Sequence, residues 1–149
     1  FDSEKDVLKD YRIKIPWLIK SDNIPSGTQN NMSENVDLFP TLLKINNIDY
    51  DDKTIDGSLP ISLGGKSKKF SKSQSFHQDQ PYLLRLESDN YIYKFESNQK
   101  LHKNLTWDDL KEKKLTIKNK QKNCIEDENE KKEAERLYDS SCKKFFNIN

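Results

Sequence analysis

The chain has 149 residues, of which 32% are hydrophobic and 34% are charged, and its 26 basic and 25 acidic residues leave a formal net charge of +1. This balance provides no broad electric field that would attract nucleic acid or an anionic membrane, so neither is an expected partner. No apolar run approaches the roughly 20 residues that span a bilayer, and the modest apolar content predicts a thin core.

The first structured segment expected in chain order is residues 13–19, with the sequence IKIPWLI. Its β-branched and aromatic side chains are typical of a buried strand, and Pro16, which has no N–H group, should lie at an edge or a bulge. Residues 22–35 contain the Asp, Asn, Pro, Ser and Gly residues of a surface loop. We therefore expect one strand followed by an irregular connection.

A helix is expected directly after Asp37. Its carboxylate can accept hydrogen bonds from the free N–H groups of a first turn, and Pro40 falls where no N–H donor is missed. Apolar residues then recur at helical spacing and form one apolar stripe, composed of Leu38, Phe39, Leu42, Leu43 and Ile45. We expect this stripe to be buried, because each fully buried side chain contributes about 1.5–3 kcal/mol. Asp37 itself is interpreted as a helix cap and not as a catalyst.

The middle of the chain predicts antiparallel strands. Residues 82–86 and 91–95 are rich in β-forming side chains and flank a Ser-Asp-Asn turn, so a β-hairpin is expected over 82–95. Residues 106–110 read as a capped helical turn.

The last third is more polar. Residues 111–123 are basic, with only Leu115 and Ile117 to bury, and no regular element is predicted for them. Residues 126–138 carry Glu and Lys at helical spacing but few apolar residues, which predicts a charged helix on the surface.

Four short blocks, taken in order, carry a resemblance to a known family. They are IPWLIK at 15–20, IPSG at 24–27, VDLFPTLL at 36–43 and DGSL at 56–59. The chain thereby resembles the C-terminal part of a sulfatase, in which R-V-P-L-I-V, a P-x-G loop, V-D-L-x-P-T-L-L and D-G-x-S-L commonly occur in this order. The hairpin over 82–95 is similar to a later strand pair of that family.

This resemblance implies an α/β fold. Residues 1–65 would form the C-terminal part of an alkaline phosphatase-like α/β core, in which the helix after Asp37 packs on the central sheet. Residues 66–149 would form a small antiparallel-sheet subdomain with a terminal helix, containing the hairpin over 82–95 and a charged helical tail.

The resemblance also implies hydrolysis of sulfate esters. Sulfatases use a hydrated formylglycine, made from Cys or Ser within C/S-x-P-x-R, beside a divalent cation usually identified as calcium. Neither Cys124 nor Cys142 lies in that motif, and they lack the C-x-x-C spacing of a zinc or redox site, so they are two unpaired thiols or one incidental disulfide. No catalytic residue and no metal ligand is assigned within the chain. We expect both, with the calcium, in polypeptide outside it.

Two residues are candidates for substrate binding. A lysine commonly lies eleven residues before the proline of R-V-P in sulfatases and points at the substrate sulfate, and this position corresponds to Lys5. A fixed cation there stabilises the charge that develops on the sulfuryl oxygens. Some sulfatases also place a histidine in the downstream region, where His77 lies, although an exposed side chain with no function is the alternative for this residue.

Two other interpretations remain open at this point. One is part of a phosphoethanolamine or phosphoglycerol transferase of the same superfamily, which uses threonine with zinc or manganese. The other is a non-catalytic interaction module whose charged tail, residues 111–136, contacts a partner. The sulfatase resemblance implies a sulfated small molecule or glycan as substrate and a periplasmic or secreted location. The oligomeric state stays unknown.

Overall fold

A computed structural model describes residues 7–24, 26–121 and 127–146 of the chain. The chain divides into two units, one of residues 1–15 with 72–149 and one of residues 16–71. The structure contains both helices and a four-stranded antiparallel sheet, so the expected mixed α/β class is confirmed. The division at residue 65 implied by the resemblance stays a prediction.

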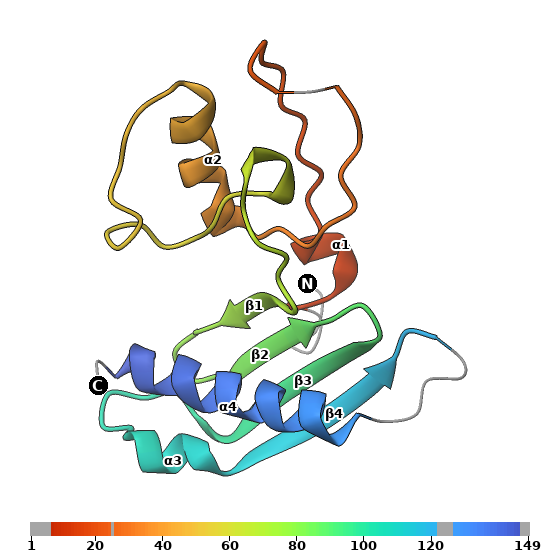
Figure 1. The fold of residues 1–149 in the computed structure, drawn as a ribbon. Helices are drawn as coiled ribbons and strands as arrows, with labels where there is room; N and C mark the ends of the chain where they lie inside the picture. The colour runs from red at the N-terminus through yellow and green to blue at the C-terminus, as the bar shows by residue number, and fades with distance from the viewer. Residues whose placement is uncertain (1–6, 25, 122–126, 147–149) are drawn as a thin grey trace. The chain divides into compact units, whose positions relative to one another are not determined.

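The first unit is built on the sheet, whose strand order β1-β2-β3-β4 follows the sequence (Figure 1). The strands are β1 (Ser71–Ser75), β2 (Pro81–Glu87), β3 (Tyr91–Lys100) and β4 (Lys113–Asn119). β2 and β3 form the predicted hairpin, with Leu84 opposite Phe95 and Leu86 opposite Tyr93. A short helix, α3 (Trp107–Lys111), joins β3 to β4 and is capped by Thr106, as the sequence predicts.

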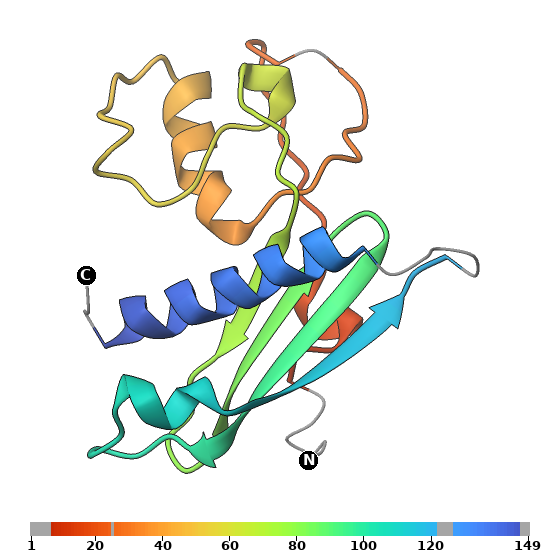
Figure 2. The ribbon, with the colours of Figure 1, turned by 60° about the horizontal axis from the view of Figure 1, so that its bottom comes forward.

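The long helix α4 (Glu128–Phe145) lies across one face of this sheet (Figures 1 and 2). Its inward residues Ala134, Tyr138 and Cys142 recur every fourth position and are completely buried. The Tyr138 ring packs against Phe95 of β3 at a centroid distance of 5.0 Å, and its hydroxyl donates to the Leu110 carbonyl at 2.9 Å. The core of this unit therefore lies between α4 and the sheet.

The helix expected over 126–138 is thus longer and more buried than the sequence prediction. Glu130, expected on the surface, is buried and accepts hydrogen bonds from the Ser88 and Tyr93 hydroxyls at 2.5 and 3.2 Å. Burial raises the pKa of the Cys142 thiol to about 12, so this free cysteine behaves as a small apolar core residue. Cys124 lies outside the described residues.

The opposite face of the sheet is contacted by the segment that contains α1 (Asp10–Ile13) (Figure 2). The strand predicted over 13–19 is wrong, because residues 14–20 form no helix or strand. Ile15 is 59% exposed and Leu18 is fully exposed. β-branched side chains favour a strand only where a neighbouring strand accepts their backbone hydrogen bonds, and none pairs with this segment in the described chain.

In the second unit, the described residues 16–24 and 26–71 contain one α-helix and two short 3-10 helices. η2 (Asn35–Asp37) leads directly into α2 (Leu38–Ile45), and η3 (Ile61–Leu63) follows the D-G-S-L turn. The carbonyl of Ile45, at the C-terminal end of α2, accepts a hydrogen bond from the Asn23 amide at 2.7 Å. The predicted helix after Asp37 is therefore confirmed.

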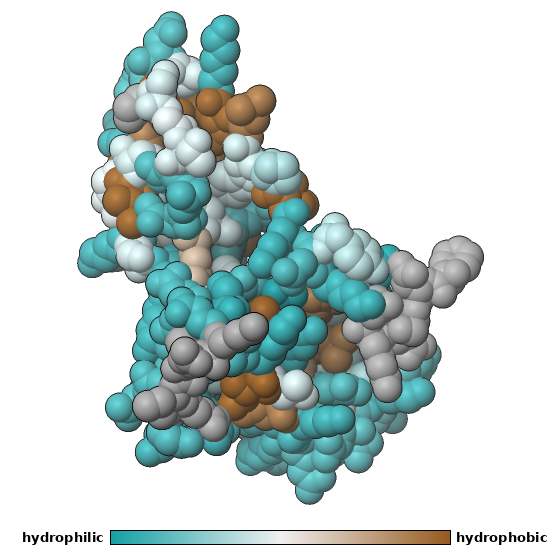
Figure 3. All heavy atoms as spheres, turned by 90° about the vertical axis from the view of Figure 1, so that its right-hand side faces the viewer, coloured by the Kyte–Doolittle hydropathy of each residue, from teal (hydrophilic) through white to brown (hydrophobic). Residues whose placement is uncertain are grey.

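The prediction that the apolar stripe is buried is wrong for this chain. Leu38, Phe39 and Leu42 are 37%, 58% and 41% exposed. Leu43 is half-buried, and Ile45 is the one buried residue of the stripe. Pro40, Thr41 and Ile45 form the face of α2 that is buried instead. Figure 3 likewise shows apolar side chains reaching the surface at several places. Within the described part of the chain, no helix is long and apolar enough to cross a membrane.

Candidate functional site

The structure describes one of the two residues predicted to bind substrate. Lys5 lies outside the described residues. His77 is exposed, in the loop between β1 and β2, where its carbonyl accepts a hydrogen bond from the Gln80 N–H at 3.1 Å. Among the described residues, no group of three or more Asp, Glu, His or Cys side chains could hold a metal ion. The chemistry of the chain must therefore be sought in its other polar clusters.

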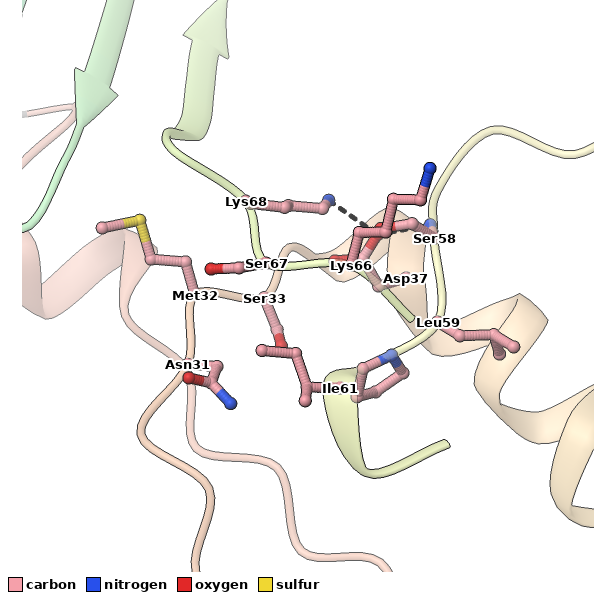
Figure 4. A pocket seen from close by; sticks show the side chains of 11 residues that line it. Asn31, Met32, Ser33, Asp37, Ser58, Leu59, Ile61, Lys66, Ser67 and Lys68 are labelled. Atoms are coloured by element: carbon pink, nitrogen blue, oxygen red, sulfur yellow. Dashed lines mark hydrogen bonds and ion pairs between the residues drawn. The ribbon is translucent and has the colours of Figure 1, made fainter. Parts of the chain in front are cut away.

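The most connected polar side chain of the second unit is Asp37, which is only 2% exposed. Its Oδ2 atom accepts a hydrogen bond from the Glu34 N–H at 2.8 Å. Its Oδ1 atom accepts from the Ser58 N–H at 2.8 Å and from the Lys68 ammonium at 2.7 Å (Figure 4). One carboxylate thus joins the start of the helix to the D-G-S-L turn and to residues 66–68.

The role of Asp37 differs from the predicted one. Its carboxylate makes no capping bond to the first turn of α2. Instead, Glu34 is the N-cap of η2 and Asp37 is its third residue, so that each side chain accepts the backbone N–H group of the other in a capping box. The additional 3-10 turn moves the cap back by one turn, and this frees the second oxygen of Asp37 for long-range contacts.

Lys68 completes this cluster. Its ammonium group lies 2.6 Å from Glu34 Oε2 and 2.7 Å from Asp37 Oδ1, and its side chain is 19% exposed. Burial alone would lower the pKa of Lys68, but the hydrogen bonds to Asp37 and Glu34 outweigh it and raise the pKa above its usual value. We call Glu34, Asp37, Ser58 and Lys68 the carboxylate clip.

Gly57 brings the D-G-S-L turn against the clip. Its φ angle is +108°, in the left-handed region that side chains rarely adopt. A Cβ atom at this position would lie 2.3 Å from the Val36 carbonyl oxygen and 3.1 Å from the Asp37 nitrogen. The glycine is therefore required twice, by its backbone conformation and by the close approach of the helix start.

We expect Gly57→Ala to destabilise residues 16–71 by more than the roughly 1–3 kcal/mol typical of a strained backbone position, because the backbone clash adds to that cost. Urea unfolding checks this. The matched control is Gly27→Ala, because the φ of Gly27 is also positive at +155° but no atom lies within 4 Å of the position that an alanine Cβ would take there. Equal losses in the two variants would contradict the role given to the close approach.

A shallow hollow lies beside the clip (Figure 4). Its walls include polar side chains from three segments, namely Asn31, Ser33, Ser58, Lys66, Ser67 and Lys68. It has room for no more than a water-sized guest. Since both carboxylates of the clip are bound to Lys68, they hold the unit together and are not free to act as a general base.

A second charged cluster occupies the sheet face opposite α4. Arg85 of β2 is 2% exposed, and its guanidinium donates to the Leu8 carbonyl at 2.9 Å and contacts Asp10 and Glu87, each at 2.6 Å. Glu87 also accepts from Lys14 and Lys120, each at 3.0 Å. Two carboxylates are thereby surrounded by three cations, and they fasten the segment containing α1 to the sheet.

These contacts set the ionisation of the second cluster. Burial raises the pKa of Glu87, but hydrogen bonds from Lys120, Lys14 and Arg85 outweigh it, so the pKa lies below its usual range. For Lys14, burial lowers the pKa, while hydrogen bonds to Glu87 and Asp10 raise it further than burial lowers it. Glu87 and Lys14 are therefore both charged near neutral pH.

Sequence reasoning missed the partners in both clusters. Lys68 lies 31 residues from Asp37, and no local pattern connects them. Arg85 and Glu87 alternate with Leu84 and Leu86 in a strand, and this alternation was a usable signal that the second sheet face carries buried charge.

Comparison of the chain with protein-family models, with curated proteins and with solved structures finds no match. The functional proposal consequently rests on the sequence blocks and on the geometry of the described residues.

Proposed function

We propose that the chain is the C-terminal part of a sulfatase-type hydrolase with an alkaline phosphatase-like core. The observation that carries the proposal is the order of the four sequence blocks between residues 15 and 59. Two of these blocks, V-D-L-F-P-T-L-L and D-G-S-L, are joined through the bond from the Ser58 N–H to the Asp37 carboxylate. Their signature residues Asp37, Gly57 and Ser58 thus depend on one another, which gives a physical reason for their joint occurrence.

One feature of the fold supports this proposal. The first unit is a small antiparallel sheet with a terminal helix, which is the kind of subdomain that the resemblance implies. In the second unit, Leu38, Phe39 and Leu42 are exposed in this chain, which is contrary to the burial that was expected of them and counts against the proposal. The proposal requires that a central sheet in polypeptide outside this chain covers the apolar stripe.

In the proposed enzyme, the nucleophile and calcium ligands come from polypeptide outside this chain. The formylglycine would attack sulfur and the calcium would bind sulfate oxygens. The contribution of this chain would be the Lys5 ammonium, with His77 as a further contact. A cation about 4 Å from the sulfate contributes on the order of 4 kcal/mol at an effective dielectric constant near 20, before its desolvation is subtracted.

This contribution is too small for catalysis by the chain alone. Enzymatic rate enhancement requires the barrier to fall by roughly 8–23 kcal/mol, which one lysine cannot supply. We therefore expect the purified 149-residue chain to leave an aryl sulfate uncleaved. Cleavage that is lost in a Lys5→Ala variant would contradict this expectation.

The deciding test is to read the coding sequence upstream of this chain. A C/S-x-P-x-R motif, followed by aryl sulfate hydrolysis by the full-length protein, would support the sulfatase proposal. A threonine nucleophile motif would instead indicate the phosphoethanolamine or phosphoglycerol transferase. If no upstream nucleophile motif were encoded, the proposal would be wrong and a non-catalytic interaction module would replace it.

A further inference from the structure

The sheet face opposite α4 carries a group of exposed lysines at its β3–β4 end. Alternate residues of a strand point to opposite faces, and Phe95 and Lys113 contact Tyr138 of α4. Lys94 of β3 and Lys114 and Lys118 of β4 therefore point away from α4, and all three are exposed. We call these three residues the lysine face.

The register fixes the spacing of the lysine face. Lys94 lies opposite Thr116, which is midway between Lys114 and Lys118. At about 3.3 Å per residue, the two lysines of β4 are separated by roughly 13 Å along the strand, and Lys94 lies beside the middle of that interval. Glu96 lies opposite Lys114, whereas Arg85 and Glu87 of β2, which lie opposite Lys94 and Ile92, cancel each other in charge. The three lysines and Glu96 therefore leave a local charge of +2.

These lysines differ from others of the same unit in lacking partners within the described chain. Lys14 and Lys120 bind Glu87, Lys113 binds Asp139 and Lys111 binds Asp108. Among the described residues, the side chains of Lys94, Lys114 and Lys118 make no ion pair and no hydrogen bond. Lys94 lies diagonal to Lys114 and Lys118, so their like charges repel each other at this longer range, and an anion bound among them would relieve that repulsion.

The surroundings of the lysine face indicate which anion fits. Proteins that bind single-stranded nucleic acid stack bases on exposed aromatic rings. The aromatic residues Tyr93 and Phe95 of β3 point instead toward α4, where they are buried at 0% and 1% exposure. Ile92, the apolar residue of β3 on the lysine face, is buried at 6% exposure and could not enter a membrane. Charge without stacking or apolar contact fits a polysaccharide that carries anionic groups.

We propose that the lysine face binds a sulfated polysaccharide, whose sulfate groups pair with the three ammonium groups. Lysine-rich strands of this kind provide the electrostatic attraction that heparin-like chains require. The inference stands on the charge pattern of the sheet and is independent of the proposed sulfatase activity. Binding can be measured on this chain whether or not the hydrolysis proposal holds.

The test uses fluorescent heparin and the complete 149-residue chain, with affinity measured by anisotropy at low salt. We expect the triple variant K94Q/K114Q/K118Q to bind about tenfold more weakly, because three unpaired cations are removed together. The matched control, K103Q/K132Q/R136Q, removes three exposed cations elsewhere in the same unit and should change the affinity less than about twofold. Circular dichroism verifies that both variants stay folded.

Two further probes make the proposal specific. Unsulfated hyaluronan should bind more weakly than heparin, and an oligothymidylate should also bind more weakly, because the aromatic rings of β3, the strand that carries Lys94, are buried and not open to base stacking. Equal losses of heparin affinity in the two triple variants would overturn the proposal, since binding would then follow total charge. Tighter binding of the oligothymidylate than of heparin would overturn it in favour of nucleic acid.

Discussion

Replacement of Asp37 by alanine should lower the free energy of unfolding of residues 16–71 by about 3–5 kcal/mol, the usual cost of removing one partner from a buried ion pair. The substitution leaves the N–H groups of Glu34 and Ser58 without their acceptor and leaves Lys68 with Glu34 alone. The loss should be read by urea unfolding in a Trp107→Phe background, where Trp17 is the remaining tryptophan and lies in this unit.

The control for this prediction is Asp51→Ala. Asp51 is exposed in the same unit, and its side chain accepts a local hydrogen bond from the Lys53 N–H at 2.9 Å. Loss of such an exposed bond should cost no more than about 1 kcal/mol. Similar losses for Asp37→Ala and Asp51→Ala would show that the carboxylate clip does not hold the unit together.

The elements that the sequence predicted correctly are those whose signal is local. The hairpin over 82–95 combines two strands rich in β-forming residues with a Ser-Asp-Asn turn, so residues close together in the sequence are sufficient to predict it. The helix after Asp37 is similarly defined by its own periodicity and by Pro40 in its first turn. In both cases, the segment forms its own backbone hydrogen bonds or forms them with its nearest neighbour in sequence.

The strand β4 was missed because its inward positions include a lysine. Lys113, Leu115 and Ile117 alternate and are the partly buried residues of the strand. The Lys113 ammonium lies 4.5 Å from the centre of the Tyr138 ring and 2.9 Å from Asp139. A lysine stem can cover apolar surface while its charge stays paired, so counting Lys113 as polar concealed the period of two.

The burial of the apolar stripe was wrong because helical periodicity does not identify the partner surface. Asp37, Pro40, Thr41 and Ile45 share the inward face of the helix, and this face mixes polar with apolar residues. The bonds that select it come from Ser58 and Lys68, which are 21 and 31 residues away. Such long-range polar contacts cannot be predicted from the hydrophobic periodicity of the helix alone.

For the charged cluster on the sheet face opposite α4, the alternation in β2 was a local signal of buried charge, but the partners of these charges could not be predicted locally. Arg85 lies 77 residues from its acceptor at Leu8. The composition of the cluster nevertheless predicts that its members contribute unequally to stability, since its three cations, Arg85, Lys14 and Lys120, outnumber its two carboxylates. Loss of a carboxylate should therefore be more harmful than loss of the arginine.

We expect Glu87→Gln to lower the free energy of unfolding of the sheet unit by about 3–5 kcal/mol, because the buried Arg85 and Lys14 would then share only the exposed Asp10 and Lys120 would keep only its bond to the Ser88 carbonyl. Arg85→Met should cost less, about 1–3 kcal/mol, because it keeps the aliphatic stem and leaves Glu87 paired with Lys14 and Lys120. Trp107 fluorescence in a Trp17→Phe background provides the measurement.

The double variant should lose less than the sum of the single losses, since the two side chains contact each other. A larger loss for Arg85→Met than for Glu87→Gln would show that the arginine, and not the shared carboxylate, holds this cluster together.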